Sequence, residues 1–240
     1  STLSSSSAAS DVYKRQVQEL FAQEYGRDTE YVTYGANTRP VEPTGELARH
    51  GLEPGRYLLQ VAAIVPDKGV HLLVEAYEQL ETDMQLVIVG DTLYADEYKA
   101  RVMATSDKRI HFLGYIFGEP CRELVANAYA YVHPLIVDGT SPALLQAMAL
   151  GKCVVSTDLP ETMGVIEGAA IPFKSQDVAD LRAKLRFALD HPDEVARYGR
   201  LARRRVDERY NWDTVSRQYE ALSFKALDQH YDVSLFGAAQ

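Results

Sequence analysis

Apolar and polar positions follow two different periods along the central part of the chain. Short, mostly apolar runs predict strands, and the segments between them carry apolar residues at helical spacing. The expected strands are 57–64, 85–90, 110–114, 129–137 and 152–156, and the expected helices are 70–80, 95–104, 119–128 and 141–151. Strands that alternate with such helices are typical of parallel βαβ units. We therefore expect an α/β fold with a doubly wound parallel sheet, covered by helices on both faces.

Residues 1–56 differ in pattern from the alternation of strands and helices that follows them. Residues 1–16 combine a Ser/Ala-rich run with the hexapeptide DVYKRQ, which resembles a translated sequencing adaptor. We expect them to be a disordered artefact and exclude them from the fold. Residues 17–26 predict a short amphipathic helix, and residues 30–37 predict a strand that ends in a turn. Six prolines and glycines over 38–56 predict a linker or surface loop.

Helical periodicity continues after the last expected strand. Apolar residues at helical spacing predict three helices, over 176–191, 193–210 and 212–227. We expect residues 57–227 to form one domain and residues 228–240 to be a tail. In doubly wound sheets ligands bind beyond the carboxyl ends of the strands, so candidate site residues are sought in the loops that follow the strands.

Composition narrows the class of protein. The 240 residues carry a net charge of −9, which is untypical of a general nucleic-acid binder. No uncharged apolar run approaches the roughly 18 residues that a membrane span needs. The two cysteines, Cys121 and Cys153, are too few for a disulfide framework and favour a reducing cytoplasm. Because the sequence has no paired Cys/His clusters, we expect no metal site.

The segment DGTSPALLQAMALG, residues 138–151, is the clearest candidate for binding chemistry. Ser141 is a good N-cap, and Pro142 occupies the first helical position, where its missing N–H costs nothing. The amides of Ala143 and Leu144 then point out of the helix start. Together with the helix dipole they are suited to bind an anion such as a phosphate.

Gln146 is the single polar side chain of the expected helix between Pro142 and Leu150. A buried amide needs hydrogen-bond partners, and two kinds of partner are open. One is the backbone of a neighbouring loop, and the other is a polar ligand in the cleft. The position shortly after the carboxyl end of a strand favours the ligand.

Two interpretations are open for Lys68, for His133 and for one basic run. Lys68 precedes an expected helix, where a cation opposes the helix dipole unless an anion binds there. The sequence PDKG fits an ordinary solvated turn equally well. His133 could serve as a catalytic base, although a satisfied structural histidine is the favoured reading. The run RYGRLARRR at 197–205 is read as a solvated helix face, with contact to an anionic membrane as the alternative.

The order of the segments resembles a known family. VPDKG, LVIVGD, IHFLGYI and VHPLIVDGTSPALLQAMALGKCVVSTDLPE together resemble the donor-binding half of the family-4 glycosyltransferases. The resemblance runs from about residue 57 to residue 227. It implies the Rossmann-like C-terminal half of a GT-B fold, which holds the nucleotide and is followed by C-terminal helices. Residues 17–37 are then implied to be a remnant of the N-terminal, acceptor-side domain.

The family pattern assigns roles around the expected phosphate-binding helix. Asp138 corresponds to a glutamate that contacts the sugar, and it is the implied catalytic residue. Gln146 corresponds to a glutamate that binds the ribose, and Lys68 to a lysine that neutralises the diphosphate. Ala63 stands where the pattern has a second cation, an arginine. Asp138 keeps the charge on a shorter stem, and Gln146 keeps hydrogen bonding but loses the charge. Ala63 removes one of two cations that stabilise the leaving group, and such stabilisation is usually a large share of catalysis.

Further binding residues follow from the same resemblance. Gly139, Thr140 and Ser141 lie at the start of the phosphate-binding helix and are implied to contact the nucleotide sugar. Tyr115 and Ile116 lie where the family lodges the base.

The resemblance implies a fragment of a glycosyltransferase, inactive alone, in polysaccharide biosynthesis. Such enzymes move a sugar from a nucleoside-diphosphate sugar to a glycan or lipid-linked acceptor, with retention at the anomeric carbon, without a metal and with no cofactor besides the donor. Two alternatives stay open: an inactive nucleotide-sugar-binding module and a GT-B sugar-nucleotide epimerase. We expect no nucleic-acid partner and a cytoplasmic location, with peripheral contact at the inner membrane surface as a further expectation.

Overall fold

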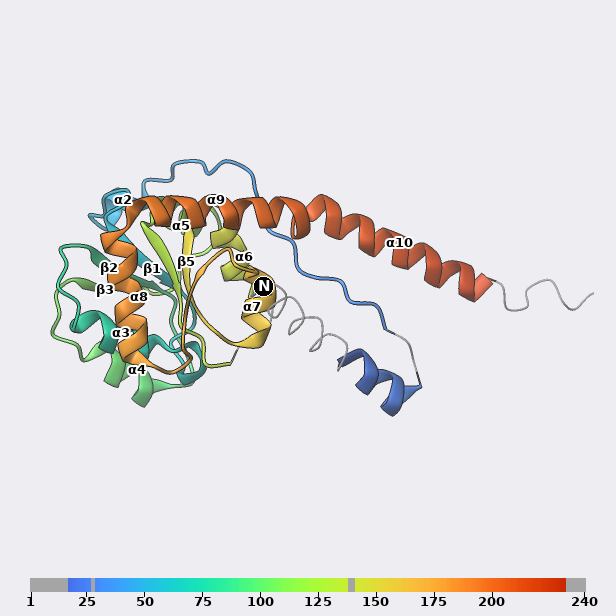
Figure 1. Ribbon diagram of the computed structural model, residues 1–240, viewed down its shortest axis with the longest axis horizontal. Helices are drawn as coiled ribbons and strands as arrows, with labels where there is room; N and C mark the ends of the chain where they lie inside the picture. Colours follow the sequence, from blue (N-terminus) through green and yellow to red (C-terminus); the bar gives the residue numbers. More distant parts are fainter. Residues whose placement is uncertain (1–16, 27–28, 138–140, 232–240) are drawn as a thin grey trace, which may run out of the picture.

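The computed structural model describes residues 17–26, 29–137 and 141–231. The described chain forms a six-stranded sheet in the order β3-β2-β1-β4-β5-β6, with helices on both faces (Figure 1). Every pair of neighbouring strands is parallel. This is the doubly wound α/β arrangement that the sequence predicts. The expected artefact at 1–16 and residues 232–240 of the expected tail lie outside the described residues.

The strands are short and almost entirely buried. Their bounds are β1 Tyr57–Val61, β2 Gln85–Val89, β3 Ile110–Phe112, β4 Ala130–His133, β5 Cys153–Thr157 and β6 Ile171–Phe173. Helices shield both faces of the sheet, so the side chains that alternate between the faces are mostly apolar and the strands do not alternate between apolar and polar residues. Valine and isoleucine are frequent in them because β-branched side chains pack well on a pleated surface.

The helices divide between the two faces of the sheet. Their bounds are α2 Glu46–Arg49, α3 Val70–Glu78, α4 Asp96–Met103, α5 Gly118–Asn127, α6 Pro142–Ala149, α7 Pro160–Ile166, α8 Val178–Asp190, α9 Pro192–Arg209 and α10 Trp212–Tyr231. Helices α3, α4 and α8 cover one face, and α5, α6 and α7 cover the other. Helix α9 contributes to both, with Val195 in the first core and Ala202 and Val206 in the second. Each face therefore has its own hydrophobic core.

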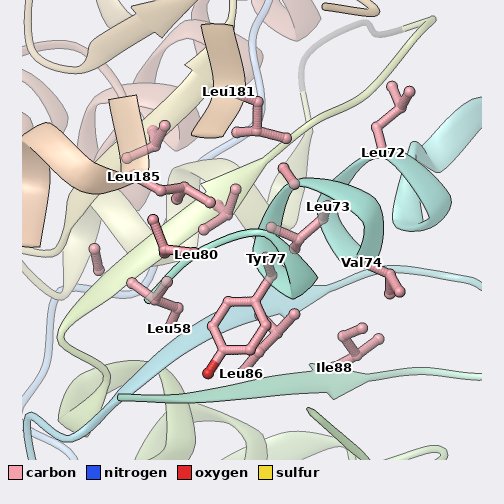
Figure 2. Packing of buried hydrophobic residues seen from close by; sticks show 14 of the residues in the cluster. Leu58, Leu72, Leu73, Val74, Tyr77, Leu80, Leu86, Ile88, Leu181 and Leu185 are labelled. Carbon is pink, nitrogen blue, oxygen red and sulfur yellow. The ribbon is translucent and has the colours of Figure 1, made fainter. Parts of the chain in front are cut away.

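Figure 2 shows the core between the sheet and helices α3 and α8. Tyr77 of α3 lies against Leu58 of β1 and Leu86 of β2, and Leu185 approaches from α8. All four side chains are fully buried. The Tyr77 hydroxyl donates to the backbone carbonyl of Met84, so its burial leaves no unpaired polar group. Burial of each leucine contributes about 1.5–3 kcal/mol, which makes this layer a main source of stability.

The far end of the sheet differs from the sequence-based expectation, which contains neither α7 nor β6. The seven residues of α7 are too few to establish a helical period. Strand β6 has only three residues, with Pro172 at its centre. Proline lacks a donor for the ladder and is tolerated on edge strands, and β6 is the edge strand beside β5.

Residues 29–37, here named the leading segment, do not form the strand that was expected at 30–37. They make a single isolated parallel bridge, between Ala36 and Asn211. The amide of Ala36 donates to the carbonyl oxygen of Tyr210 at 2.7 Å. The alternating pattern of this segment therefore predicts an extended chain correctly, but the described residues supply no partner strand along its length. The helix expected at 17–26 is present over residues 17–25.

Helix α10 extends beyond the layers formed by the sheet and the other helices (Figure 1). Large apolar side chains are exposed along it, namely Trp212, Tyr219, Phe224 and Leu227. At the start of the helix, the indole of Trp212 covers Gly35 of the leading segment. A Cβ on Gly35 would lie 2.5 Å from the indole ring, so a side chain at this position would displace Trp212.

The expected linker at 38–56 packs against the α/β unit and contains the short helix α2. Leu47 of α2 is buried in the core of the α5–α6 face. Glu123 of α5 is also buried and accepts hydrogen bonds from the amides of Thr44 and Glu46, at 2.8 and 3.1 Å. A buried carboxylate that receives several backbone amides holds this part of the linker in place.

Candidate functional site

The strand order places a topological switch point between β1 and β4. From β1 the chain runs outward to β2 and β3, whereas from β4 it runs outward in the opposite direction, to β5 and β6. The loop after β1 leads to α3 on one face of the sheet, and the loop after β4 leads to α6 on the other. In such sheets the diverging loops create the crevice where ligands bind.

Backbone contacts join these two loops. The amide of Ile136, after β4, donates to the carbonyl oxygen of Asp67, after β1, at 2.9 Å. Gly69 has a φ of +64°, and a Cβ on it would lie 1.9 Å from the carbonyl oxygen of Pro134. Only glycine combines this conformation with such a close approach. The two loops therefore form one connected surface at the switch point.

Lys68 ends a 3-10 turn, Pro66–Lys68, in the loop after β1. Its carbonyl oxygen accepts from Nε2 of the buried Gln60 at 2.8 Å, which holds the backbone of the turn. The turn expected for PDKG is thus present. The Lys68 side chain is half-buried, and it has no ion pair within the described part of the chain. Its charge is available to an anion at the crevice.

Helix α6 begins at the crevice as the sequence predicts. Ser141 is the N-cap, and its Oγ accepts from the amide of Leu144 at 3.4 Å, with Pro142 at the first helical position. The first amides of a helix have no acceptor within the helix, so the amide of Ala143 is directed outward. This arrangement and the helix dipole favour an anion at the helix start. Asp138, Gly139 and Thr140, which precede the cap, lie outside the described residues.

Gln146, one turn into α6, makes a hydrogen bond to the backbone. Its Nε2 donates to the carbonyl oxygen of Asn37 in the leading segment at 3.1 Å. The first of the two expected partners, a neighbouring backbone, is therefore present. A ligand contact of Gln146 stays a prediction.

Tyr115 and Ile116 follow β3 and differ in their surroundings. Tyr115 is 49% exposed and stacks on Phe117, with ring centroids 5.6 Å apart and planes inclined by 14°. Ile116 instead packs against the core of the α5–α6 face. The amide of Gly90 donates to the carbonyl oxygen of Gly114 at 2.8 Å, which ties this loop to the end of β2. The sequence analysis did not single out Phe117. Its position two residues after Tyr115, in the loop that follows a strand, was the signal that could have identified it.

The structure also shows the surroundings of Ala63 and His133. Ala63 is exposed in the loop after β1. His133 is 2% exposed and stacks with Tyr131 at 6.1 Å, a setting that fits a structural histidine. Ser156, the register partner of His133 in β5, is fully buried, and its Oγ has no hydrogen-bond partner among the described residues. The sequence did not single out Ser156 because a serine near a strand end is common.

The basic run at 197–205 lies on α9 and is largely paired. Arg203 and Arg204 form ion pairs with acidic residues one turn later, at 2.9 and 2.7 Å, and Arg205 donates to the carbonyl oxygens of Gly164 and Val165. Such pairing is typical of a solvated helix face. Among the described helices, none is long and apolar enough to cross a membrane. The described residues contain no group of three or more metal-ligating side chains.

The chain is similar to several curated bacterial proteins. It is 30% identical over 203 residues to an MMP α-(1→4)-mannosyltransferase of Mycolicibacterium hassiacum, over 82% of this chain and 48% of that protein. It is 29% identical to the D-rhamnosyltransferase WbpZ of Pseudomonas aeruginosa, over 76% of this chain and 50% of that protein. The chain thus spans about half the length of the curated relatives that it matches.

Solved structures confirm the fold. A glycosyltransferase from Rickettsia africae superposes with a TM-score of 0.77 at 15% identity, over 89% of this chain and 62% of that chain. Anabaena Alr3699/HepE, solved in complex with UDP, superposes with a TM-score of 0.73 at 21% identity, over 87% of this chain and 62% of that chain. At these identities the likeness concerns the architecture alone.

The family assignment rests on a match that covers the sheet and the switch point. The sequence model of the family described as glycosyl transferases group 1 matches residues 47–205, which is more than half of the chain. The match confirms the resemblance drawn from the ordered loop motifs, and the chain belongs to the glycosyl transferases group 1 family.

Proposed function

We propose that this chain is the donor-binding half of a glycosyltransferase. The whole enzyme moves a sugar from a nucleoside-diphosphate sugar to a glycan or lipid-linked acceptor, with retention at the anomeric carbon and without a metal. The transfer breaks the bond between the anomeric carbon and a phosphate oxygen, and forms a bond from that carbon to an acceptor hydroxyl oxygen, whose proton is released. Family membership and the names of the mannosyl- and rhamnosyltransferase relatives support this reaction class.

The observation that carries the proposal is the pair of anion-binding elements at the switch point. Lys68 has a charge unpaired within the described residues, on a turn that is bonded to the loop before α6. The start of α6, capped by Ser141, offers outward amides and the positive end of a helix dipole. A diphosphate bound between Lys68 and the start of α6 has its negative charge next to both of these positive groups. The charge that develops on the leaving diphosphate is then stabilised by groups already in position.

The remaining donor contacts in the proposal come from the family pattern. Asp138 contacts the transferred sugar, Gly139 and Thr140 lie beside the diphosphate, and Gln146 accepts from a ribose hydroxyl. The base lies at Tyr115 and Ile116, where the exposed Tyr115–Phe117 stack offers an aromatic surface suited to a nucleobase.

Titration calorimetry with uridine and guanosine diphosphate tests the proposal. The wild-type chain should bind at least one of them, and Lys68→Ala should weaken that binding and flatten its salt dependence, because a phosphate-paired cation is lost. Lys108→Ala is the matched control, since Lys108 is an exposed turn lysine just before β3, at the opposite end of the sheet. Equal affinities of the wild-type, Lys68→Ala and Lys108→Ala chains at low salt would contradict the proposal.

A further inference from the structure

The hydrogen bond between Gln146 and Asn37 joins two distant parts of the chain. The residues are 109 positions apart, and Gln146 is the single polar side chain of α6. Asn37 ends the leading segment, just before the chain enters the α/β unit. A helix that begins at the proposed diphosphate site thus holds, one turn later, the backbone by which the preceding chain is attached.

The chain that leaves the α/β unit reaches the same place. The amide of Ala36 donates to the carbonyl oxygen of Tyr210 at 2.7 Å, and Ala36 bridges to Asn211. These two residues lie between α9 and α10. The incoming and outgoing connections therefore meet beside α6, and the Gln146–Asn37 bond attaches both of them to that helix.

The two atoms of the Gln146 carboxamide have different chemistry. Nε2 donates to Asn37, whereas Oε1 accepts no hydrogen bond from the described residues. A carboxylate has no proton to donate, so a glutamate at this position would place its charge against the Asn37 carbonyl oxygen. An amide alone holds the leading segment and keeps an acceptor for a ligand. This accounts for glutamine at a position where the family pattern has glutamate.

We infer that Gln146 is a positioning residue that couples the nucleotide site to the two chain connections. Its Nε2 holds Asn37, and its Oε1 accepts from a hydroxyl of the bound nucleotide's ribose. The inference rests on the proposed function for the ligand, but the bond to Asn37 exists without it. Because coupling between two binding events is reciprocal, nucleotide binding orders the leading segment, and an ordered leading segment strengthens nucleotide binding.

Hydrogen exchange of the whole 240-residue chain tests this inference. The readout is the amide of Ala36, followed by mass spectrometry on peptides that cover residues 33–38. Without nucleotide, Gln146→Leu and Gln146→Glu should speed its exchange about fivefold, which corresponds to the ~1 kcal/mol of a typical hydrogen bond. Gln218→Leu, an exposed glutamine on α10, is the matched control and should leave exchange unchanged. Uridine or guanosine diphosphate should slow exchange in the wild-type chain and in the control only.

The outcomes separate the inference from the proposed function. Unchanged exchange in both Gln146 variants without nucleotide would overturn the role of the Asn37 bond. A wild-type chain that binds nucleotide by calorimetry, while exchange at Ala36 stays the same, would overturn the coupling and leave the proposed function intact. Absence of nucleotide binding would overturn the proposed function and the coupling together. Circular dichroism of each variant confirms that the same fold is compared, and Gln146→Glu keeps the original side-chain size.

Discussion

Gly69 lies against the carbonyl group of Pro134, so that a Cβ on Gly69 would come within 1.9 Å of that oxygen. This contact brings the loops after β1 and β4 together at the switch point. The position of Lys68 relative to α6 therefore depends on a residue that has no side chain.

Gly69→Ala should destabilise the fold by more than about 2 kcal/mol, because it combines a left-handed backbone with a clash against backbone atoms. Gly51→Ala is the matched control: Gly51 has a φ of +62°, and a Cβ added there would meet no other atom within 4 Å. The control should lose only the ~1 kcal/mol of the backbone strain. Urea unfolding measures both, and equal losses would mean that the loops move apart freely.

Tyr115→Ala should weaken nucleoside diphosphate binding by about 1–3 kcal/mol, since stacking of a base on an aromatic ring contributes this much. Phe117→Ala should weaken it too, because Phe117 holds the Tyr115 ring in its stacked orientation. Tyr219→Ala removes a similarly exposed tyrosine from α10 and should leave affinity unchanged. Calorimetry of the three variants checks this. A base that binds elsewhere would leave Tyr115→Ala at wild-type affinity.

Ala63→Arg should strengthen diphosphate binding by about 1 kcal/mol and steepen its salt dependence. Ala63 is exposed in the loop beside Lys68, so an arginine fits there and adds the second cation of the family pattern. Ala104→Arg adds the same charge at an exposed position just after α4 and serves as the control. If Ala63→Arg and Ala104→Arg strengthen diphosphate binding equally, the effect depends on net charge alone and not on the position of Ala63.

Glu123→Gln should make stability less dependent on pH in acid. A hydrogen bond from Thr44, together with amides that include that of Glu46, lowers the pKa of the Glu123 carboxyl in the folded chain. Its contribution is therefore full above the unfolded pKa of about 4.3 and is lost as the pH falls through the lower folded pKa. Urea unfolding between neutral pH and acid should show a shallower loss for Glu123→Gln than for wild type. Glu81→Gln, at an exposed loop residue, should follow the wild-type curve.

The 240-residue chain should show little or no sugar transfer by itself. It spans about half the length of its curated relatives, so a cleft between two domains would have only one wall here. Release of nucleoside diphosphate from a panel of nucleotide sugars, with and without glycan acceptors, measures this. Robust turnover would place the whole catalytic apparatus within these residues.

Local patterns predicted most of the fold and part of the site. Five strands were recognisable because each is a short, mostly apolar run, and the Ser141 cap because capping depends on neighbouring residues alone. Strand β6 was not predicted because its three residues, with Pro172 at the centre, carry no strand pattern. The Gln146–Asn37 bond escaped for a different reason. The acceptor is a backbone carbonyl oxygen 109 positions away. Every residue has such an oxygen, so the residue pattern cannot indicate which one accepts.

Trp212 is the only tryptophan of the chain, and its half-exposed indole rests on Gly35. The protein thus contains an intrinsic fluorophore at the point where its two chain connections meet. Emission from the indole shifts to longer wavelength when water replaces a packed neighbour, so separation of the leading segment from the start of α10 becomes visible without any label. Stopped-flow mixing with a nucleotide that absorbs little at the excitation wavelength would then time the movement of this junction directly.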